Sequence, residues 1–97
     1  MIDTLAVVGA TGAVGRIILD LLASRNFPAR QLKLLASPRS AGRTIEAGGR
    51  QFTVEALKPE AFAGVQIAIG STPDEVAAEF VPWAVERGTV VVDESAH

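Results

Sequence analysis

The sequence contains no cysteine and no tyrosine, and its one histidine is the last residue, His97. Without cysteine, these 97 residues hold no disulfide, no thiolate metal site and no cysteine nucleophile. A lone histidine at the end of the chain provides no local cluster of metal ligands. We therefore assign no metal-binding and no catalytic residue to this chain.

Long apolar runs and an excess of positive charge are also missing. Stretches such as LAVV and TVVV are too short to span a bilayer, and no basic and then apolar leader opens the sequence. The formal net charge of -2 provides no basic surface for nucleic acid. We expect a cytoplasmic protein that binds neither a membrane nor nucleic acid.

Apolar strands and amphipathic helices alternate along the chain. Short apolar runs predict buried parallel strands, and 3.6-residue periodicity predicts helices. Gly48 and Gly49 between two alternating runs predict a hairpin. This order indicates an α/β fold, a Rossmann-like doubly wound, mainly parallel sheet with helices on both faces and a β-hairpin insertion. The strands are predicted at 4–8, 31–36, 65–71 and 89–93, the helices at 13–25 and 72–88, and the hairpin at 44–54.

Particular residues are expected to begin, interrupt or end the two helices, and others to form the apolar side of the first. Thr72 is expected to cap the second helix with Pro73 in its first turn, whereas Pro82 is expected to kink or split it. The segment 26–28, NFP, is expected to end the first helix. Five residues at helical spacing form the apolar side of the first helix: Val14, Ile17, Ile18, Leu21 and Leu22.

Three glycines, three residues apart, lie in the segment VVGATGAVGR between the first strand and the first helix. The spacing differs from the commoner G-x-G-x-x-G, but its place after a strand and before a helix is what a phosphate-binding turn requires. Gly9 permits the sharp turn, Gly12 lets the backbone approach a pyrophosphate, and Gly15 lets the helix lie close to its strand. The amides of the first helical turn would face the anion, and Thr11 would add a hydroxyl. The sequence predicts a nucleotide site; the alternative is a purely structural turn.

The segment LLASPRSAGR, which follows the second strand, bears on the choice of nucleotide. Folds that bind NAD place an acidic residue about 20 residues after the glycines, on the ribose 2′-hydroxyl. No acid occurs there in this chain. Ser37, Arg39 and Ser40 occupy the segment instead, and a guanidinium with hydroxyls suits a 2′-phosphate. We predict NADP rather than NAD; the alternative is a solvated basic loop, which is our interpretation of Arg43.

The stretch VVGATGAVGRIILDLLASRNFPARQLKLLASPRSAGR closely resembles the start of bacterial aspartate-β-semialdehyde dehydrogenase. The glycine turn, RNFP, LLAS and RSAG occur in the order found in that family. GRQFTVEAL is similar to the family's hairpin, and GTVVVDESAH is similar to its V-V-D-N-S-S-A stretch. The resemblance covers nearly the whole chain.

The resemblance implies a two-domain enzyme, usually a homodimer, that reduces L-aspartyl-4-phosphate to L-aspartate 4-semialdehyde with NADPH in lysine, methionine and threonine biosynthesis. In that family a cysteine thiolate attacks the acyl phosphate and a histidine handles the protons. Both would lie downstream, as would contact with the acyl-phosphate substrate. Residues 1–97 are therefore expected to be an NAD(P)-binding domain without its catalytic and dimerisation domain, inactive alone. Exposed apolar surface is then expected to make it self-associate or only modestly stable.

By the motif match, the glycine turn would hold the pyrophosphate, and the loop after the second strand would hold the 2′-phosphate. Two further residues end the third strand beside the expected cleft, where capping of the next helix is the alternative. The segment GSTPDEV departs from the family's S-A-G-G type of loop, and Glu94 stands where the family has Asn. The candidate cofactor-binding residues are Gly9, Thr11, Gly12, Ala13, Val14, Gly15, Ser37, Arg39, Ser40, Ser71 and Thr72.

Other functions remain open at this point. N-acetyl-γ-glutamyl-phosphate reductase has a similar first domain, although the RSAG loop argues against it. A non-catalytic paralogue would act as a nucleotide-binding or interaction module. Sugar-nucleotide epimerases also use T-G-x-x-G-x-x-G, and a structural domain without ligand is the last alternative.

Overall fold

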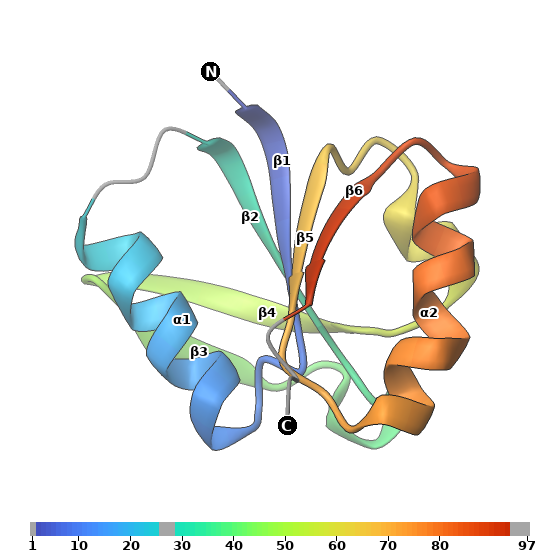
Figure 1. Cartoon of the computed structure of the whole chain (residues 1–97). Coiled ribbons are helices and arrows are strands. Elements are labelled where there is room, and N and C mark those ends of the chain that lie inside the picture. Colours follow the sequence, from blue (N-terminus) through green and yellow to red (C-terminus); the bar gives the residue numbers. More distant parts are fainter. Residues whose placement is uncertain (1, 26–28, 94–97) are drawn as a thin grey trace.

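The computed structural model describes residues 2–25 and 29–93, so the predicted helix stop at 26–28 and residues 94–97 lie outside it. Within the described residues the chain forms one six-stranded sheet with two α-helices (Figure 1). The elements are β1 (Ile2–Val8), α1 (Ala13–Ser24), β2 (Ala29–Ala36), β3 (Thr44–Ala47), β4 (Arg50–Ala56), β5 (Ile67–Gly70), α2 (Asp74–Glu86) and β6 (Val90–Asp93), with 3₁₀ turns at Pro38–Ser40 and Pro59–Phe62.

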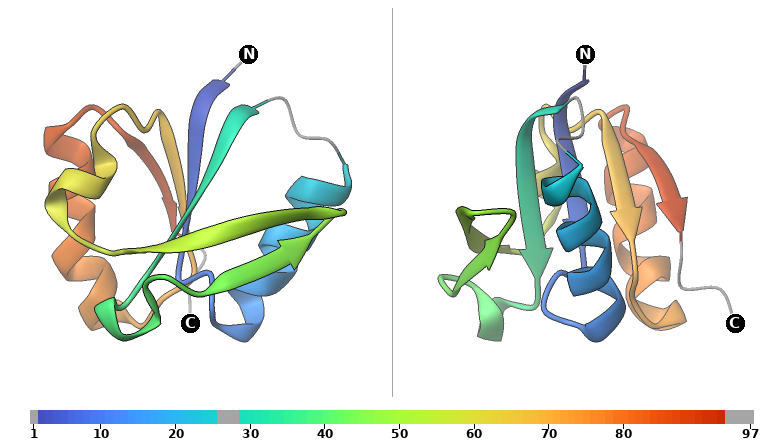
Figure 2. Two further views of the ribbon diagram at one scale, coloured as in Figure 1. Left: turned by 180° about the vertical axis from the view of Figure 1, so that it is seen from behind. Right: turned by 90° about the vertical axis from the view of Figure 1, so that its left-hand side faces the viewer.

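The strand order of the sheet is β3-β4-β2-β1-β5-β6, and every neighbouring pair except β3–β4 is parallel. In this order β1 is central, since Val7 pairs with Leu34 of β2 on one side and with Ile69 of β5 on the other. The chain leaves β1 for β2 through α1, and leaves β5 for β6 through α2, in opposite directions along the sheet. The two helices therefore cover opposite faces (Figures 1 and 2). The doubly wound, mainly parallel fold predicted from the sequence is confirmed.

The predicted hairpin forms, but it is more than an insertion. Gly48 and Gly49 adopt φ of 57° and 78° in a two-residue turn that joins β3 to β4. Beyond the hairpin, β4 continues as a parallel neighbour of β2, with Val54 opposite Leu34. Val54 is buried because that half of β4 is part of the main sheet.

Each face of the sheet carries its own apolar core. On the α1 face, Leu19 of the helix packs with strand residues such as Leu34. On the α2 face, the rings of Phe62 and Phe80 stack with centroids 5.8 Å apart. The Phe80 ring also lies against Gly70, where a Cβ would come within 2.9 Å of its Cζ atom. This stack fixes the position of α2 over the sheet.

The predicted apolar side of α1 is only partly correct. Ile18 and Leu22 are half-buried against the sheet, but the helix buries Gly15 and Leu19 most completely. The other three predicted residues point outward because α1 lies over β1 and β3 and its apolar stripe is wider than that contact. Their exposed fractions are 52% for Val14, 59% for Ile17 and 49% for Leu21.

Strand β6 adds more exposed apolar surface on the same side of the sheet. Val90 and Val92 are opposite Ile67 and Ile69 of β5, which pack into the α1-side core. No helix of the described chain covers this part of the sheet (Figure 2, right). We call the following residues the uncovered apolar face: Val14, Ile17, Leu21, Val90 and Val92.

For α2, the predicted N-cap is wrong, and so is one of the two outcomes expected at Pro82, a split of the helix. Its N-cap is Pro73, not Thr72, and no side chain makes a capping hydrogen bond. The helix also runs through Pro82 without splitting, because proline removes one hydrogen bond while Phe80 and Ala84 remain buried on either side. The helix ends at Glu86, and Gly88 follows it with φ of 80°. No helix among residues 2–25 and 29–93 is long and apolar enough to cross a membrane.

Candidate dinucleotide-binding site

The glycine turn lies at the carboxyl edge of the parallel strands, at the bottom of Figure 1. Hydrogen bonds there hold the residue after β1 to β2, and the residue after β5 to β1. The Gly9 amide donates to the Leu35 carbonyl at 2.8 Å, and the Ser71 amide donates to the Val8 carbonyl at 3.0 Å. The chain connections diverge between β1 and β5, which is where open α/β sheets bind ligands.

Gly9 and Gly15 are required by the packing of the turn itself. Gly9 has φ of 85°, and a Cβ at this position would overlap the carbonyl oxygen of Ser71. A Cβ at Gly15 would overlap the carbonyl oxygen of Gly9. The sharp turn and the close helix expected from the sequence are both present.

Gly12 has a different environment. It is the N-cap of α1 with φ of -81°, a conformation open to any residue, and a Cβ there would meet only the Gly9 oxygen at 3.5 Å. The fold does not require glycine at this position. With glycine there, no side chain covers the backbone of the turn. The first-turn amides of Ala13, Val14 and Gly15 have no intrahelical acceptor, and no side chain caps α1. A bare turn with unpaired amides at a helix N-terminus fits a pyrophosphate.

A cavity of about 300 Å³ lies next to this turn. It is bounded by the glycine turn, the ends of β2 and β4 and the first half of α2, and carbon atoms dominate its wall. Its dimensions suit a purine nucleoside more than a whole dinucleotide. The lining residues are Gly9, Thr11, Ala36, Ser37, Pro38, Leu57, Thr72, Val76 and Glu79.

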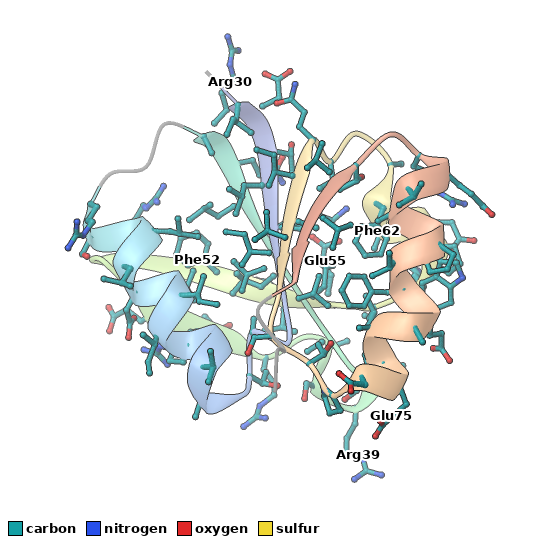
Figure 3. All side chains as sticks on the ribbon, in the orientation of Figure 1. Arg30, Arg39, Phe52, Glu55, Phe62 and Glu75 are labelled. Atoms are coloured by element: carbon teal, nitrogen blue, oxygen red, sulfur yellow. The ribbon has the colours of Figure 1, made fainter. Side chains whose placement is uncertain are left out.

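Four of the predicted residues therefore share one cavity: Gly9, Thr11, Ser37 and Thr72. Arg39 and Ser40 lie in the adjoining 3₁₀ turn, which the Ser40 amide closes by donating to the Ser37 carbonyl at 2.9 Å. Arg39 is exposed and extends away from the ribbon at the lower edge of Figure 3. It forms no ion pair with the described residues. Arg39 is not part of the cavity wall, although its turn adjoins the cavity.

Thr72 differs from the other three predicted residues of the cavity because it is buried. Its side chain is 9% exposed, and its Oγ1 has no hydrogen-bond partner among the described residues. Since no side chain caps α2, the capping role considered for Ser71 and Thr72 is wrong. A buried hydroxyl without a partner costs free energy, of the order of 1–3 kcal/mol, and Thr72 is one of the residues that line the cavity.

Sequence reasoning missed Leu57, Val76 and Glu79. Leu57 reaches the cavity through the parallel pairing of β4 with β2, which the sequence did not indicate. Val76 and Glu79 are three residues apart on α2, so one face of this helix meets the cavity. The spacing could be seen in the sequence, but the sequence did not show which segments this face of α2 would meet.

A second hollow of about 270 Å³ lies on the hairpin side of the turn, lined by Thr11, Arg16, Arg43 and Glu46 among others. Arg16 is engaged there, since it donates to the Glu46 carbonyl at 2.6 Å and pairs with Asp20 at 3.3 Å. Arg43 is exposed. Among residues 2–25 and 29–93, no three His, Cys, Asp or Glu side chains gather as metal ligands.

A doubly wound sheet with a bare glycine turn and a nucleoside-sized cavity at its carboxyl edge defines a dinucleotide-binding domain of the Rossmann class. The sequence model of one family, described as "Semialdehyde dehydrogenase, NAD binding domain", matches residues 4–97. The chain belongs to this family.

Two curated relatives share one activity name. The chain is 45% identical to aspartate-semialdehyde dehydrogenase of Synechocystis over 91 residues, which cover 94% of this chain and 27% of the relative. The Bacillus subtilis enzyme of the same name is 46% identical, with 94% of this chain and 26% of the relative covered. The chain thus spans about a quarter of the length of these relatives.

Solved structures agree in fold. Aspartate semialdehyde dehydrogenase II of Vibrio cholerae, complexed with ASA, superposes with a TM-score of 0.91 at 39% identity, covering 100% of this chain and 32% of that one. The Candida albicans enzyme, solved with NADP, gives a TM-score of 0.79 at 27% identity, covering 96% of this chain and 29% of that one.

Proposed function

We propose that this chain is the NADP-binding domain, over residues 1–97, of an aspartate-semialdehyde dehydrogenase. The observation that carries the proposal is the environment of Gly12. The packing of the fold does not require glycine there, and Gly12 is the N-cap of a helix whose first amides are unpaired. The names of the relatives supply the reaction class. The whole protein reduces L-aspartyl-4-phosphate to L-aspartate 4-semialdehyde, and this chain holds the cofactor.

The cofactor runs across the carboxyl edge of the sheet. Backbone amides of residues 13–15 bind the pyrophosphate, with help from the α1 dipole. The adenosine occupies the cavity beside the turn. Ser37, Arg39 and Ser40 hold the 2′-phosphate with one guanidinium and two hydroxyls. When bound, NADPH supplies the hydride for the reduction.

The covalent chemistry belongs to residues outside these 97. The chain has no cysteine, so it provides no thiolate to attack the acyl phosphate. Alone it binds NADP(H) and is inactive. We further propose that the parent protein is a cytoplasmic homodimer active in amino-acid biosynthesis, including lysine biosynthesis.

The preference for NADP rests on the loop after β2. Its turn presents an exposed arginine beside two serines and no carboxylate, and one solved relative was crystallised with NADP. The alternative enzyme, N-acetyl-γ-glutamyl-phosphate reductase, is less well supported, since curated relatives 44–46% identical to this chain are named aspartate-semialdehyde dehydrogenase.

The experiment is a calorimetric titration of the chain with NADP⁺ and NAD⁺, repeated with Arg39→Ala. A charge-assisted contact of about 1.5–3 kcal/mol corresponds to roughly tenfold to hundredfold tighter binding of NADP⁺, and the variant should lose it. Arg30→Ala is the control, because Arg30 is also exposed but lies at the opposite end of the sheet (Figure 3).

Equal binding of the two nucleotides would overturn the NADP assignment and leave the dinucleotide site intact. If a folded chain binds neither nucleotide, the assignment of these residues as a cofactor domain is wrong. An equal loss in Arg30→Ala would show that overall charge, and not a contact at Arg39, produces the preference.

A further inference from the structure

The cavity beside the glycine turn has one ionisable group in its described wall, the carboxylate of Glu79. Much of the remaining wall is apolar and comes from different elements, with Ala36 at the end of β2, Leu57 after β4 and Val76 on α2. An apolar slot with one acidic group at its edge suits a flat heterocycle that carries a hydrogen-bond donor.

The position of Glu79 is fixed by its neighbours in the sequence. Phe80 is fully buried, stacks on Phe62 and lies against Gly70. Val76, one turn earlier, lines the same cavity. Glu79 itself is exposed and makes no ion pair with the described residues, so its carboxylate is available to a ligand.

Thr72, two residues before α2, also lines the cavity. Its Oγ1 is buried and has no hydrogen-bond partner among the described residues. Native structures seldom leave such a group unpaired. The carboxylate of Glu79, which is exposed, is therefore the group of this wall that a ligand can reach directly.

We propose that Glu79 accepts a hydrogen bond from the exocyclic amino group of adenine and so selects adenine over hypoxanthine. This inference rests on the proposed function, since it assigns a contact to the cofactor of that same site. Adenine presents an amino donor at C6. Hypoxanthine presents a carbonyl oxygen at the same position, which a carboxylate, an acceptor only, would repel.

The charges also set the orientation of the nucleotide. A phosphate near Glu79 would be repelled, whereas Ser37 and the neighbouring Arg39 come from the β2 end of the site. The 2′-phosphate is therefore directed toward the β2 loop, and the amino edge of the purine toward α2. Arg39 and Glu79 therefore contact opposite ends of the adenosine.

The test compares NADP⁺ with its deaminated analogue, nicotinamide hypoxanthine dinucleotide phosphate, by calorimetry on the 97-residue chain. The unmodified chain should bind NADP⁺ about tenfold more tightly or better, the size expected for a hydrogen bond to a charged group. In Glu79→Gln the difference should narrow to about threefold or less, because the amide can donate to the hypoxanthine oxygen.

Glu75→Gln is the matched control. Glu75 carries the same charge on the same helix but does not line the cavity, and it lies in the first turn of α2 at the lower edge of Figure 3. This variant should keep the full preference for NADP⁺. Since Glu79 is exposed, Glu79→Gln should unfold at the same urea concentration as the unmodified chain.

Each result decides a separate question. Equal binding of both nucleotides by the unmodified chain, or an unchanged preference in Glu79→Gln, would overturn the role of Glu79 and leave the proposed function standing. Binding of neither nucleotide would overturn the proposed function, and the role of Glu79 with it.

Discussion

Gly15 faces the carbonyl group of Gly9 so closely that a Cβ on Gly15 would overlap the Gly9 oxygen. Gly12, midway between them, has no such constraint, because its Cβ would lie 3.5 Å from that oxygen. The three glycines therefore have two purposes. Gly9 and Gly15 let the helix pack against the turn, whereas packing does not require Gly12, which we propose leaves room for a ligand.

Gly15→Ala should destabilise the chain. The added methyl group pushes the first turn of α1 away from Gly9, and overpacking of this kind costs about 1–3 kcal/mol. Urea unfolding followed by circular dichroism measures the loss. Unaltered stability would mean that α1 can shift at no cost, which the contact between Gly15 and the Gly9 carbonyl contradicts.

Gly12→Ala should separate binding from stability. Alanine adopts the φ of -81° found at this position and meets no close atom, so the free energy of unfolding should change by less than about 1 kcal/mol. NADP⁺ binding should weaken by about tenfold or more, because the methyl group occupies the approach of the pyrophosphate. Unchanged affinity in calorimetry would place the pyrophosphate elsewhere.

Gly70 and Phe80 should be energetically coupled. An alanine at position 70 would bring its Cβ within 2.9 Å of the Phe80 ring, so Gly70→Ala should cost about 1–3 kcal/mol. Phe80→Leu creates a cavity, but it also removes the colliding ring atom. In a double-mutant cycle the two changes together should cost less than the sum of the single changes, by about 0.5 kcal/mol or more. Simple additivity would show that the ring moves aside freely.

Local chemistry explains why so much of the fold was predictable. The strands are short apolar runs, and the hairpin turn carries Gly48 and Gly49 at positions that need positive φ. Pairing between distant strands has no such local mark. The alternation in β4 indicates a strand with one buried face, but not that Val54 would lie beside Leu34. For the same reason, the stripe of Ile17 and Leu21 predicted a helix correctly and its burial wrongly.

The candidate site, like the fold, has a part that could be predicted from the sequence and a part that could not. The glycine turn is contiguous in sequence, so its spacing alone predicted its geometry. The cavity is assembled from four segments, and Leu57 and Glu79 enter it only through the strand order and the packing of α2. Thr72 was assigned two roles from the sequence, and only the helix boundary at Pro73 removed the capping role.

The uncovered apolar face predicts self-association of the 97-residue chain. Its five residues include Val90, which is 62% exposed, on a strand whose outer edge has no neighbour in the described sheet. Exposed apolar surface beside an open strand edge favours contact with a second copy. In sedimentation velocity, the weight-average sedimentation coefficient should rise with protein concentration.

Charge on this face should abolish the association. The double variant Ile17→Lys and Val90→Lys places a positive charge on the helix and on the strand, and it should sediment as a monomer at every concentration. Val85→Lys is the matched control, because Val85 is 60% exposed on α2, on the other side of the sheet. It should associate like the unmodified chain. A monomeric unmodified chain at high concentration would show that 52% exposure of Val14 and 59% of Ile17 is too little apolar surface to hold two copies together. Equal loss of association in Val85→Lys would assign the effect to net charge rather than to the uncovered apolar face.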